Sequence, residues 1–139
     1  MLDELDKYTD NGHFFFEAKN ELATVCNAPL DKSGVFVIYK LHNGKIELVY
    51  IGYANNIDLD LNVKINSGLK NEIVNGIHFD KNPRSIGLTY QLLKDKIDAL
   101  DIYWYVTNNS NVADDPKVVQ TQMLKRHIDV FGKLPKWNK

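Results

Sequence analysis

Two patterns of acidic, amide and histidine side chains in this sequence could bind a metal ion. Asp58, Asp60 and Asn62 have the spacing that opens a calcium-binding loop, but such a loop also needs Gly at its sixth position and an acidic ligand at its twelfth. Val63 and Leu69 stand there instead, so the acidic residues are interpreted as the polar face of a half-exposed strand. The four histidines lack the paired spacing of a zinc motif, so no histidine-built metal site is predicted.

Other motifs that define common enzyme classes are missing from the sequence. It has no phosphate-binding glycine loop and no GxSxG nucleophile motif. The single cysteine, Cys26, excludes an intramolecular disulfide and a cysteine-built zinc cluster, and is expected to be a small buried residue. The candidates that remain are two triplets, Gly34-Val35-Phe36 and Tyr50-Ile51-Gly52, taken together with the C-terminal residues.

The two triplets lie on predicted strands that form a hairpin. Residues 34–41 (GVFVIYKL) and 46–52 (IELVYIG) are rich in β-branched and aromatic side chains, and Asn43-Gly44 between them is typical of a tight turn. Residues 101–107 (DIYWYVT) predict a central strand, and the alternation of polar and apolar residues over 59–65 predicts a further strand.

An N-terminal helix is predicted over residues 14–26. Phe15, Ala18, Leu22 and Val25 recur there at helical spacing, after a possible start at Asn11-Gly12. We expect this helix to pack on the core as part of an N-terminal extension.

Three further helices are predicted downstream of the hairpin, over residues 67–75, 83–98 and 115–131. Asp114 or Asp115 followed by Pro116 marks the start of the last helix. An Asp side chain caps free N–H groups there, and Pro lacks the backbone N–H that would otherwise have no partner. In the middle helix the apolar residues at helical spacing are Ile86, Tyr90, Leu93 and Ile97.

The hairpin and the C-terminus together resemble the GIY-YIG nuclease family. The resemblance rests on the two triplets in this order, on Gln120, Met123 and Leu124, and on the ending at 131–138 (FGKLPKWN), and it covers about residues 33–138. It implies an α+β fold with a small, mainly antiparallel sheet flanked by helices. It also implies phosphodiester hydrolysis, with a Tyr near the attacking water, an Arg on the phosphate and a Glu holding one divalent metal.

The sequence keeps Tyr50 and Gly52 of the family pattern but departs from it at the first Tyr and at the Arg. Phe36 stands where the first triplet has Tyr, and Tyr39 cannot replace it, because the two positions face opposite sides of one strand. The position of the Arg falls on Asp60 when counted without a gap, or on Glu72 with an insertion. Either way an anion replaces a cation, and an anion repels phosphate.

The third departure is Gln120, which stands at the position of the metal-binding Glu. Gln120 shares a helix face with Leu124, Ile128 and Phe131, so it is expected to point inward. A neutral amide cannot offset the charge of a divalent cation. The resemblance therefore implies that the chain has lost three catalytic groups.

Charge is distributed unevenly along the chain. Residues 117–139 carry six basic residues and one acidic residue, a net charge of +5 within an overall charge of −1, which leaves −6 for residues 1–116. A basic C-terminal helix could contact a phosphate backbone, although a solvated face is the commoner explanation.

The favoured hypothesis is a single α+β domain over residues 1–139, with an N-terminal helical extension (1–32) and a GIY-YIG-like core (33–139). We expect it to be a catalytically impaired pseudoenzyme that binds nucleic acid or a protein partner and needs no cofactor. The family positions are Tyr50, which is retained, and Phe36, Glu72 and Gln120, which are substituted. The expected binding residues are Gly52, Lys70, Lys125, Arg126 and Asn138.

Three alternatives remain open at this stage. The chain could be an active DNA endonuclease that uses Mg²⁺ or Mn²⁺ and has relocated its catalytic groups, drawn from Tyr50, Glu72, His78 and Gln120, with Lys70 or Arg126 on the phosphate. It could be a purely protein-interacting domain, or its hairpin could belong to an unrelated α+β fold. The start of the sequence lacks a signal peptide and the chain has no apolar run of the roughly 20 residues that span a bilayer, so a cytoplasmic protein with no membrane partner is expected.

Overall fold

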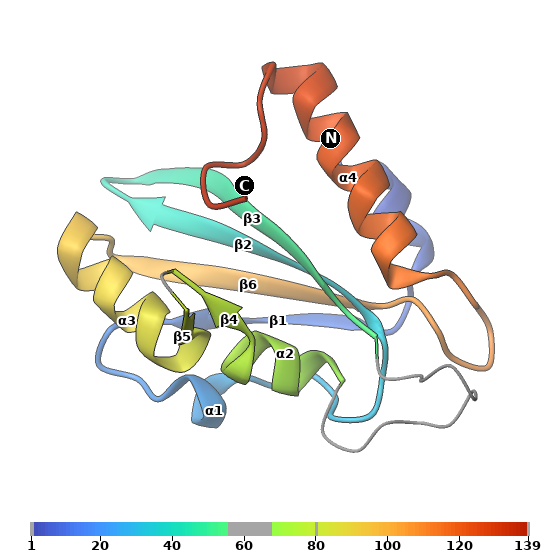
Figure 1. The fold of residues 1–139 in the computed structure, drawn as a ribbon, viewed down its shortest axis with the longest axis horizontal. Coiled ribbons are helices and arrows are strands. Elements are labelled where there is room, and N and C mark those ends of the chain that lie inside the picture. The colour runs from blue at the N-terminus through green and yellow to red at the C-terminus, as the bar shows by residue number, and fades with distance from the viewer. Residues whose placement is uncertain (1, 56–67, 80, 139) are drawn as a thin grey trace.

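A computed structural model describes residues 2–55, 68–79 and 81–138, and shows an α+β fold built on a four-stranded antiparallel sheet (Figure 1). The strand order is β1-β6-β2-β3, and β4 and β5 form a separate small hairpin. The elements are, in chain order, the 3-10 helix η1 (Asp3–Lys7), β1 (Asn11–Phe16), α1 (Leu22–Val25), β2 (Gly34–His42), β3 (Lys45–Ala54), α2 (Leu69–Asn75), β4 (Ile77–His78), β5 (Asn82–Pro83), α3 (Arg84–Asp95), β6 (Ala99–Val106) and α4 (Pro116–Phe131). The small antiparallel sheet flanked by helices is therefore confirmed.

The predicted hairpin and the central strand are confirmed. Strands β2 and β3 pair directly, and Asn43 and Gly44 at their turn both have positive φ, as a tight hairpin with the sheet's own twist requires. Strand β6 pairs with β2 on one side and β1 on the other, so it is an inner strand. The strand predicted over residues 59–65 lies outside the described residues.

The predicted N-terminal helix over residues 14–26 is wrong. Residues Asn11–Phe16 form β1, which pairs with β6, and only Leu22–Val25 are helical. Phe14 and Phe16 are buried while Phe15 between them is 54% exposed, so the side chains alternate as in a strand. The alternation is hidden in the sequence because the outward residue is also a Phe. Residues 2–32 thus contribute an edge strand of the sheet, with the short helices η1 and α1 on either side of it in the chain, rather than a helical extension.

The sheet separates two hydrophobic cores. In Figure 1 helices α1, α2 and α3 lie on one side of it, and α4 lies on the other. The first core contains Phe36 and Ile73, and the second contains Val37 and Met123. Tyr39 packs against the second core, so it does face away from Phe36, as predicted from the strand period.

Helices α2, α3 and α4 are confirmed close to their predicted bounds. The side chain of Asp115 caps α4 by accepting a hydrogen bond from the N–H of Lys117 at 2.9 Å, and Gly132 ends this helix with a φ of 77°. Ser67, the predicted cap of α2, lies outside the described residues, and Gly68 is the residue before this helix.

The faces of α3 and α4 differ from those expected. In α3 the buried side is formed by Leu88 and Leu92, whereas the predicted apolar stripe points to solvent. Its exposed members are Ile86, Tyr90 and Leu93. In α4 the buried side is formed by Pro116, Val119, Met123 and His127. Ile128 and Phe131, expected to point inward with Gln120, are exposed.

A β-bulge in β3 brings Tyr50 to the first core. Tyr50 pairs with Ile38 and Leu48 pairs with Tyr39, so Val49 is the additional residue. Leu48 therefore packs against the second core while Tyr50, two residues later, packs against the first. Since β3 is an edge strand, Tyr50 also stands at the border of the sheet.

Gly52 gives room for the two aromatic rings of this region. A methyl group on Gly52 would collide with the rings of Phe36 and Tyr50, and Phe36 is fully buried. We expect Gly52→Ala to lower the free energy of unfolding by about 1–3 kcal/mol, the usual cost of overpacking a core. Urea unfolding measures the change, with Lys45→Ala at the exposed hairpin end as control. Equal midpoints for the two variants would contradict this packing.

Candidate functional site

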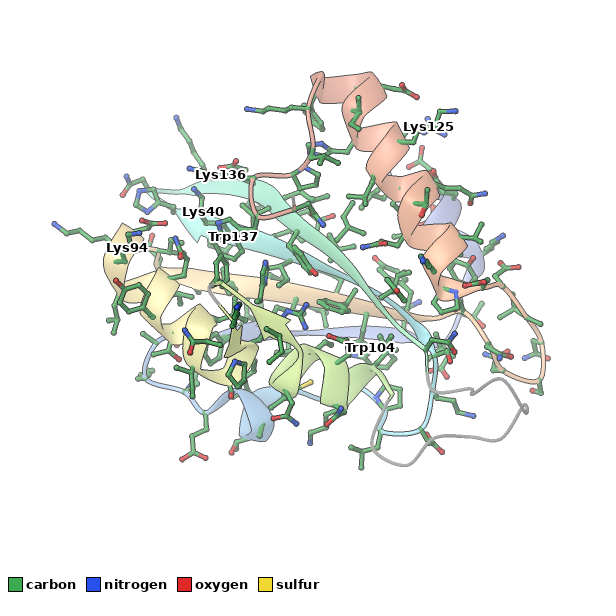
Figure 2. All side chains as sticks on the ribbon, in the orientation of Figure 1. Lys40, Lys94, Trp104, Lys125, Lys136 and Trp137 are labelled. Atoms are coloured by element: carbon green, nitrogen blue, oxygen red, sulfur yellow. The ribbon has the colours of Figure 1, made fainter. Side chains whose placement is uncertain are left out.

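A cavity of about 650 Å³ opens at the edge of the sheet beside Tyr50, between β3, the turn after β4, α4 and the C-terminal segment. We call it the Tyr50 cavity. Figure 2 shows two of its lining residues, Lys136 and Trp137, on the segment that returns from α4 to β3. Its described lining residues are Tyr50, His78, Phe79, Lys81, Gln120, Leu124, Lys136, Trp137 and Asn138.

The C-terminal segment closes the free edge of β3 next to this cavity. The N–H of Trp137 donates to the carbonyl of Val49 at 2.8 Å. The side chain of Asn138 accepts from the N–H of Ile51 and donates to its carbonyl, both at 2.9 Å. Asn138 thus makes both hydrogen bonds that a neighbouring strand would make, and the edge is protected from pairing with another chain.

Gln120 is fixed by the same backbone group. Its Nε2 donates to the carbonyl of Ile51 at 3.0 Å, and the residue is half-buried at the wall of the cavity. An ionised Glu could not donate this bond, because a carboxylate only accepts. The amide at position 120 therefore has a structural role that the carboxylate of a metal site could not fill in this conformation.

A buried arginine, Arg84, connects the residues behind Tyr50. Arg84 begins α3 and is only 3% exposed. Its Nη1 donates to the carbonyl of Glu72 and, at 2.9 Å, to the carboxylate of the same residue. Its Nη2 donates to the Tyr50 hydroxyl at 3.0 Å. The guanidinium also lies 5.0 Å from the centre of the Phe36 ring and 5.2 Å from that of Tyr50, within the range of cation–π attraction.

Arg84 orients the Tyr50 hydroxyl toward the cavity. A phenol can donate one hydrogen bond and accept others, and here its oxygen accepts from Arg84. The proton of the hydroxyl is then available for an acceptor in the cavity, which Tyr50 lines. Arg84 itself is buried behind the ring, so it holds the tyrosine and does not reach a ligand in the cavity.

His78 forms part of an aromatic stack at the cavity wall. Its ring centre lies 4.4 Å from that of Tyr50 and 4.0 Å from that of Phe79. Its Nε2 donates to the carbonyl of Trp137 at 3.2 Å, which places a proton on that nitrogen, because a carbonyl can only accept. The stack therefore ties the turn after β4 to the C-terminal segment.

Two residues of the turn after β4 have left-handed backbone conformations. Phe79 has a φ of 48° and Lys81 a φ of 73°, a region that residues other than glycine seldom occupy. Such strain of about 1–3 kcal/mol per residue persists where the surroundings fix the conformation, often at functional sites. In this turn it brings Lys81 to the rim of the cavity.

The charged side chains among the described lining residues of the cavity are cationic. Lys81 and Lys136 are exposed cations at its rim, and none of its described lining residues is acidic. Glu72, the predicted anion that the structure describes, forms an ion pair with Arg84 behind Tyr50. Lysine ammonium groups, a phenol proton and an apolar wall form a site suited to an anion such as phosphate.

The predicted site residues are only partly brought together. Tyr50, Gln120 and Asn138 line the cavity, and Phe36 and Glu72 lie behind Tyr50 around Arg84. The repulsion of phosphate expected from Glu72 does not apply, because a buried cation neutralises that carboxylate. Asp60, the other candidate for the arginine position, lies outside the described residues.

The predicted basic binding residues lie away from the cavity. Lys125 and Arg126 line a shallow depression on α4 together with Glu4 and Asp129, and Arg126 Nε is 3.7 Å from a Glu4 carboxylate oxygen. Lys70 is half-buried in the first turn of α2 and does not line the cavity. The cations among the described lining residues of the cavity are instead Lys81 and Lys136.

Sequence reasoning missed Arg84, although one signal marks it. It is one of two arginines in the chain and stands directly after Pro83, in the first turn of a helix. A cation at that end of a helix is opposed by the helix dipole. An arginine there needs stabilising partners elsewhere in the fold, and here these are Glu72 and the aromatic pair.

The described part of the chain lacks both a metal-binding cluster and a membrane-spanning helix. Residues 2–55, 68–79 and 81–138 contain no cluster of three or more His, Cys, Asp or Glu side chains that could hold a metal ion. No helix in these ranges is both long enough and apolar enough to cross a bilayer. Cys26 is buried as predicted, and burial raises the pKa of its thiol above the usual value.

Comparisons of the chain with protein-family models, with curated proteins and with solved structures find no match.

The account of Arg84 predicts a large difference between the two arginines of the chain. Arg84→Lys keeps the charge but loses the planar fork that reaches both Glu72 and Tyr50, so we expect it to lower the free energy of unfolding by about 2–3 kcal/mol. Arg126→Lys, at an exposed ion pair, is the matched control and is expected to change it by less than about 0.5 kcal/mol. Urea unfolding compares them, and similar effects at both positions would contradict the role given to Arg84.

Proposed function

We propose that this protein binds the phosphate backbone of a nucleic acid in the Tyr50 cavity and does not cleave it. The observation that carries the proposal is the lining of the cavity, which includes Lys81, Lys136 and Tyr50 and has no acidic residue among its described members. The ammonium groups supply long-range attraction, and the phenol adds a directed hydrogen bond.

The geometry around the cavity also supports the resemblance to the GIY-YIG family. The two triplets lie on paired strands, with Phe36 opposite Gly52, and the rings of Phe36 and Tyr50 are 5.8 Å apart. Asn138 of the family-like ending binds the backbone of Ile51 in the second triplet. We therefore propose a divergent domain of this family.

The same geometry favours binding over catalysis. Gln120 occupies the position of the metal-binding Glu, and its amide is bound to Ile51. Arg84 is buried in contacts with Glu72 and Tyr50 and cannot move onto a phosphate without leaving an unpaired carboxylate. Neither of the two groups that would neutralise charge in a transition state is available.

An active endonuclease is the second candidate, and one observation favours it. Arg84 donates to the Tyr50 hydroxyl, and the Tyr50 ring packs against the ring of His78. These three side chains resemble a cluster of relocated catalytic groups. In that case residues other than Gln120 would have to contribute ligands to the divalent metal.

Removal of the two cavity lysines tests the binding proposal. The affinity of Lys81→Ala/Lys136→Ala for labelled single-stranded DNA, measured by fluorescence anisotropy, is expected to fall well below that of the unchanged protein. The salt dependence, as the slope of log K against log salt, is expected to decrease by about 1 for each lysine removed.

The matched control for this test is Lys94→Ala/Lys125→Ala. These lysines lie at the end of α3 and on the outer side of α4 (Figure 2), and neither lines the cavity. An equal loss of DNA affinity in the two double variants would contradict the cavity as the binding site. A lack of binding by the unchanged protein even at low salt would leave a protein partner as the function.

A nicking experiment separates the two candidate functions. We expect supercoiled plasmid to remain intact when incubated with the protein and Mg²⁺ or Mn²⁺, because the charge-neutralising groups are missing or buried. Tyr50→Phe, purified in the same way, is the control for contaminating nucleases. Metal-dependent nicking that disappears in Tyr50→Phe would overturn the non-catalytic proposal and establish the second candidate.

A further inference from the structure

A second hollow of about 520 Å³ lies on the other side of Lys136 from the Tyr50 cavity. We call it the Phe131 groove. Its wall is formed by the apolar side chains of Ile46, Leu48, Phe131 and Leu134, which come from β3, the end of α4 and the C-terminal segment. Lys136 lines both hollows, so the two are neighbours along the edge of β3.

Two apolar side chains of the groove, those of Ile46 and Phe131, are exposed and belong to neither of the two cores. Ile46 is 73% exposed and Phe131 is 57% exposed. The ring of Phe131 is nevertheless positioned, because it lies 4.7 Å from that of His127. His127 is buried and donates from Nδ1 to the carbonyl of Lys133 at 2.6 Å. The groove therefore presents a supported aromatic face to solvent.

The charges around the groove favour a ligand that carries phosphate. Lys133 and Lys136 both line it. Glu47, the one acidic residue among its described lining residues, forms an ion pair with Lys40 at 3.2 Å and is thereby neutralised. Proteins that bind single-stranded nucleic acid commonly combine cations with aromatic rings. The cations bind the phosphates and a base stacks on the ring.

The two hollows adjoin, so one ligand could enter both. Lys136 lines both of them, and Leu48 of the groove and Tyr50 of the cavity lie two residues apart on β3, on either side of the bulge at Val49. A base reaches the groove only when it is unstacked from its neighbours and not paired, because a duplex keeps its bases inside.

We infer that the Phe131 groove takes an unpaired nucleobase whose phosphate lies in the Tyr50 cavity, so that the nucleic acid bound is single-stranded or locally unpaired. This inference rests on the proposed function, since the phosphate site supplies the anchor. The groove adds base stacking, which contributes without strong sequence preference because every base has an aromatic face.

The test compares three labelled probes of equal length: a single-stranded oligonucleotide, the same sequence as a duplex, and an abasic strand that keeps the phosphates. The unchanged protein is expected to bind the single strand about tenfold or more tightly than the abasic strand, from stacking of one base. The duplex is expected to bind no better than the abasic strand.

Phe131→Ala and Ile46→Ala carry the test of the groove. Both residues are exposed, so folding is expected to be unaffected, and they lie on different elements. Each variant is expected to lose most of the preference for the single strand while keeping the affinity for the abasic strand and the salt dependence. Ile128→Ala, also exposed on α4 but not lining the groove, is the matched control.

The outcomes separate this inference from the proposed function. Equal affinity of the unchanged protein for all three probes, abolished by Lys81→Ala/Lys136→Ala, would overturn the groove inference and leave the phosphate site intact. A preference for the single strand that survives both Phe131→Ala and Ile46→Ala would overturn it as well. Absence of binding to any probe at low salt would overturn the proposed function and the inference with it.

Discussion

The fold around the cavity depends on the stabilisation of one buried cation. Arg84 is almost completely removed from water, and a charge in that position must be paired and hydrogen-bonded. Glu72 supplies the opposite charge, the Tyr50 hydroxyl supplies an acceptor, and the Phe36 and Tyr50 rings cover the guanidinium. These contacts join α2, α3 and the β2–β3 hairpin at one point, so the position of Tyr50 at the cavity is set by the ion pair behind it.

The same contacts explain why the protein is proposed to bind rather than to cleave. A guanidinium that is used to hold Tyr50 and Glu72 is not available to a phosphate. On the cavity side, the Gln120 amide and Asn138 are both bound to Ile51, which closes the edge of β3. Among the described lining residues, two exposed lysines and the phenol proton are open to a ligand, and these groups attract an anion.

The sequence predicted those parts of the fold that local patterns determine. The β2–β3 hairpin, the β6 strand and the capped start of α4 follow from β-branched runs, an Asn-Gly turn and an Asp-Pro pair. The strand at Asn11–Phe16 could not be predicted, because three consecutive Phe residues conceal which side faces the core. The inward face of α3 was missed for a related reason: both of its sides carry large apolar residues, and only packing against the sheet selects Leu88 and Leu92.

The candidate site was predictable from the sequence only in outline. Tyr50, Gln120 and Asn138 were identified from their motif positions, and all three line the cavity. Arg84, Lys81 and Lys136 were not, because their approach to Tyr50 depends on the path of the chain through α3, the strained turn and the C-terminal segment. No spacing rule relates positions that are brought together in this way.

The most direct test of the central claim is to locate the bound nucleic acid on the protein. A short single-stranded oligonucleotide is titrated into ¹⁵N-labelled protein. The changes in amide chemical shift report which residues contact the oligonucleotide. The account predicts shifts that concentrate on Tyr50, Ile51, His78 and Lys81 and on the segment that carries Lys136. Shifts confined to Lys125, Arg126 and the outer side of α4 would contradict it, because they would place the phosphate on the depression beside Glu4 and not in the Tyr50 cavity.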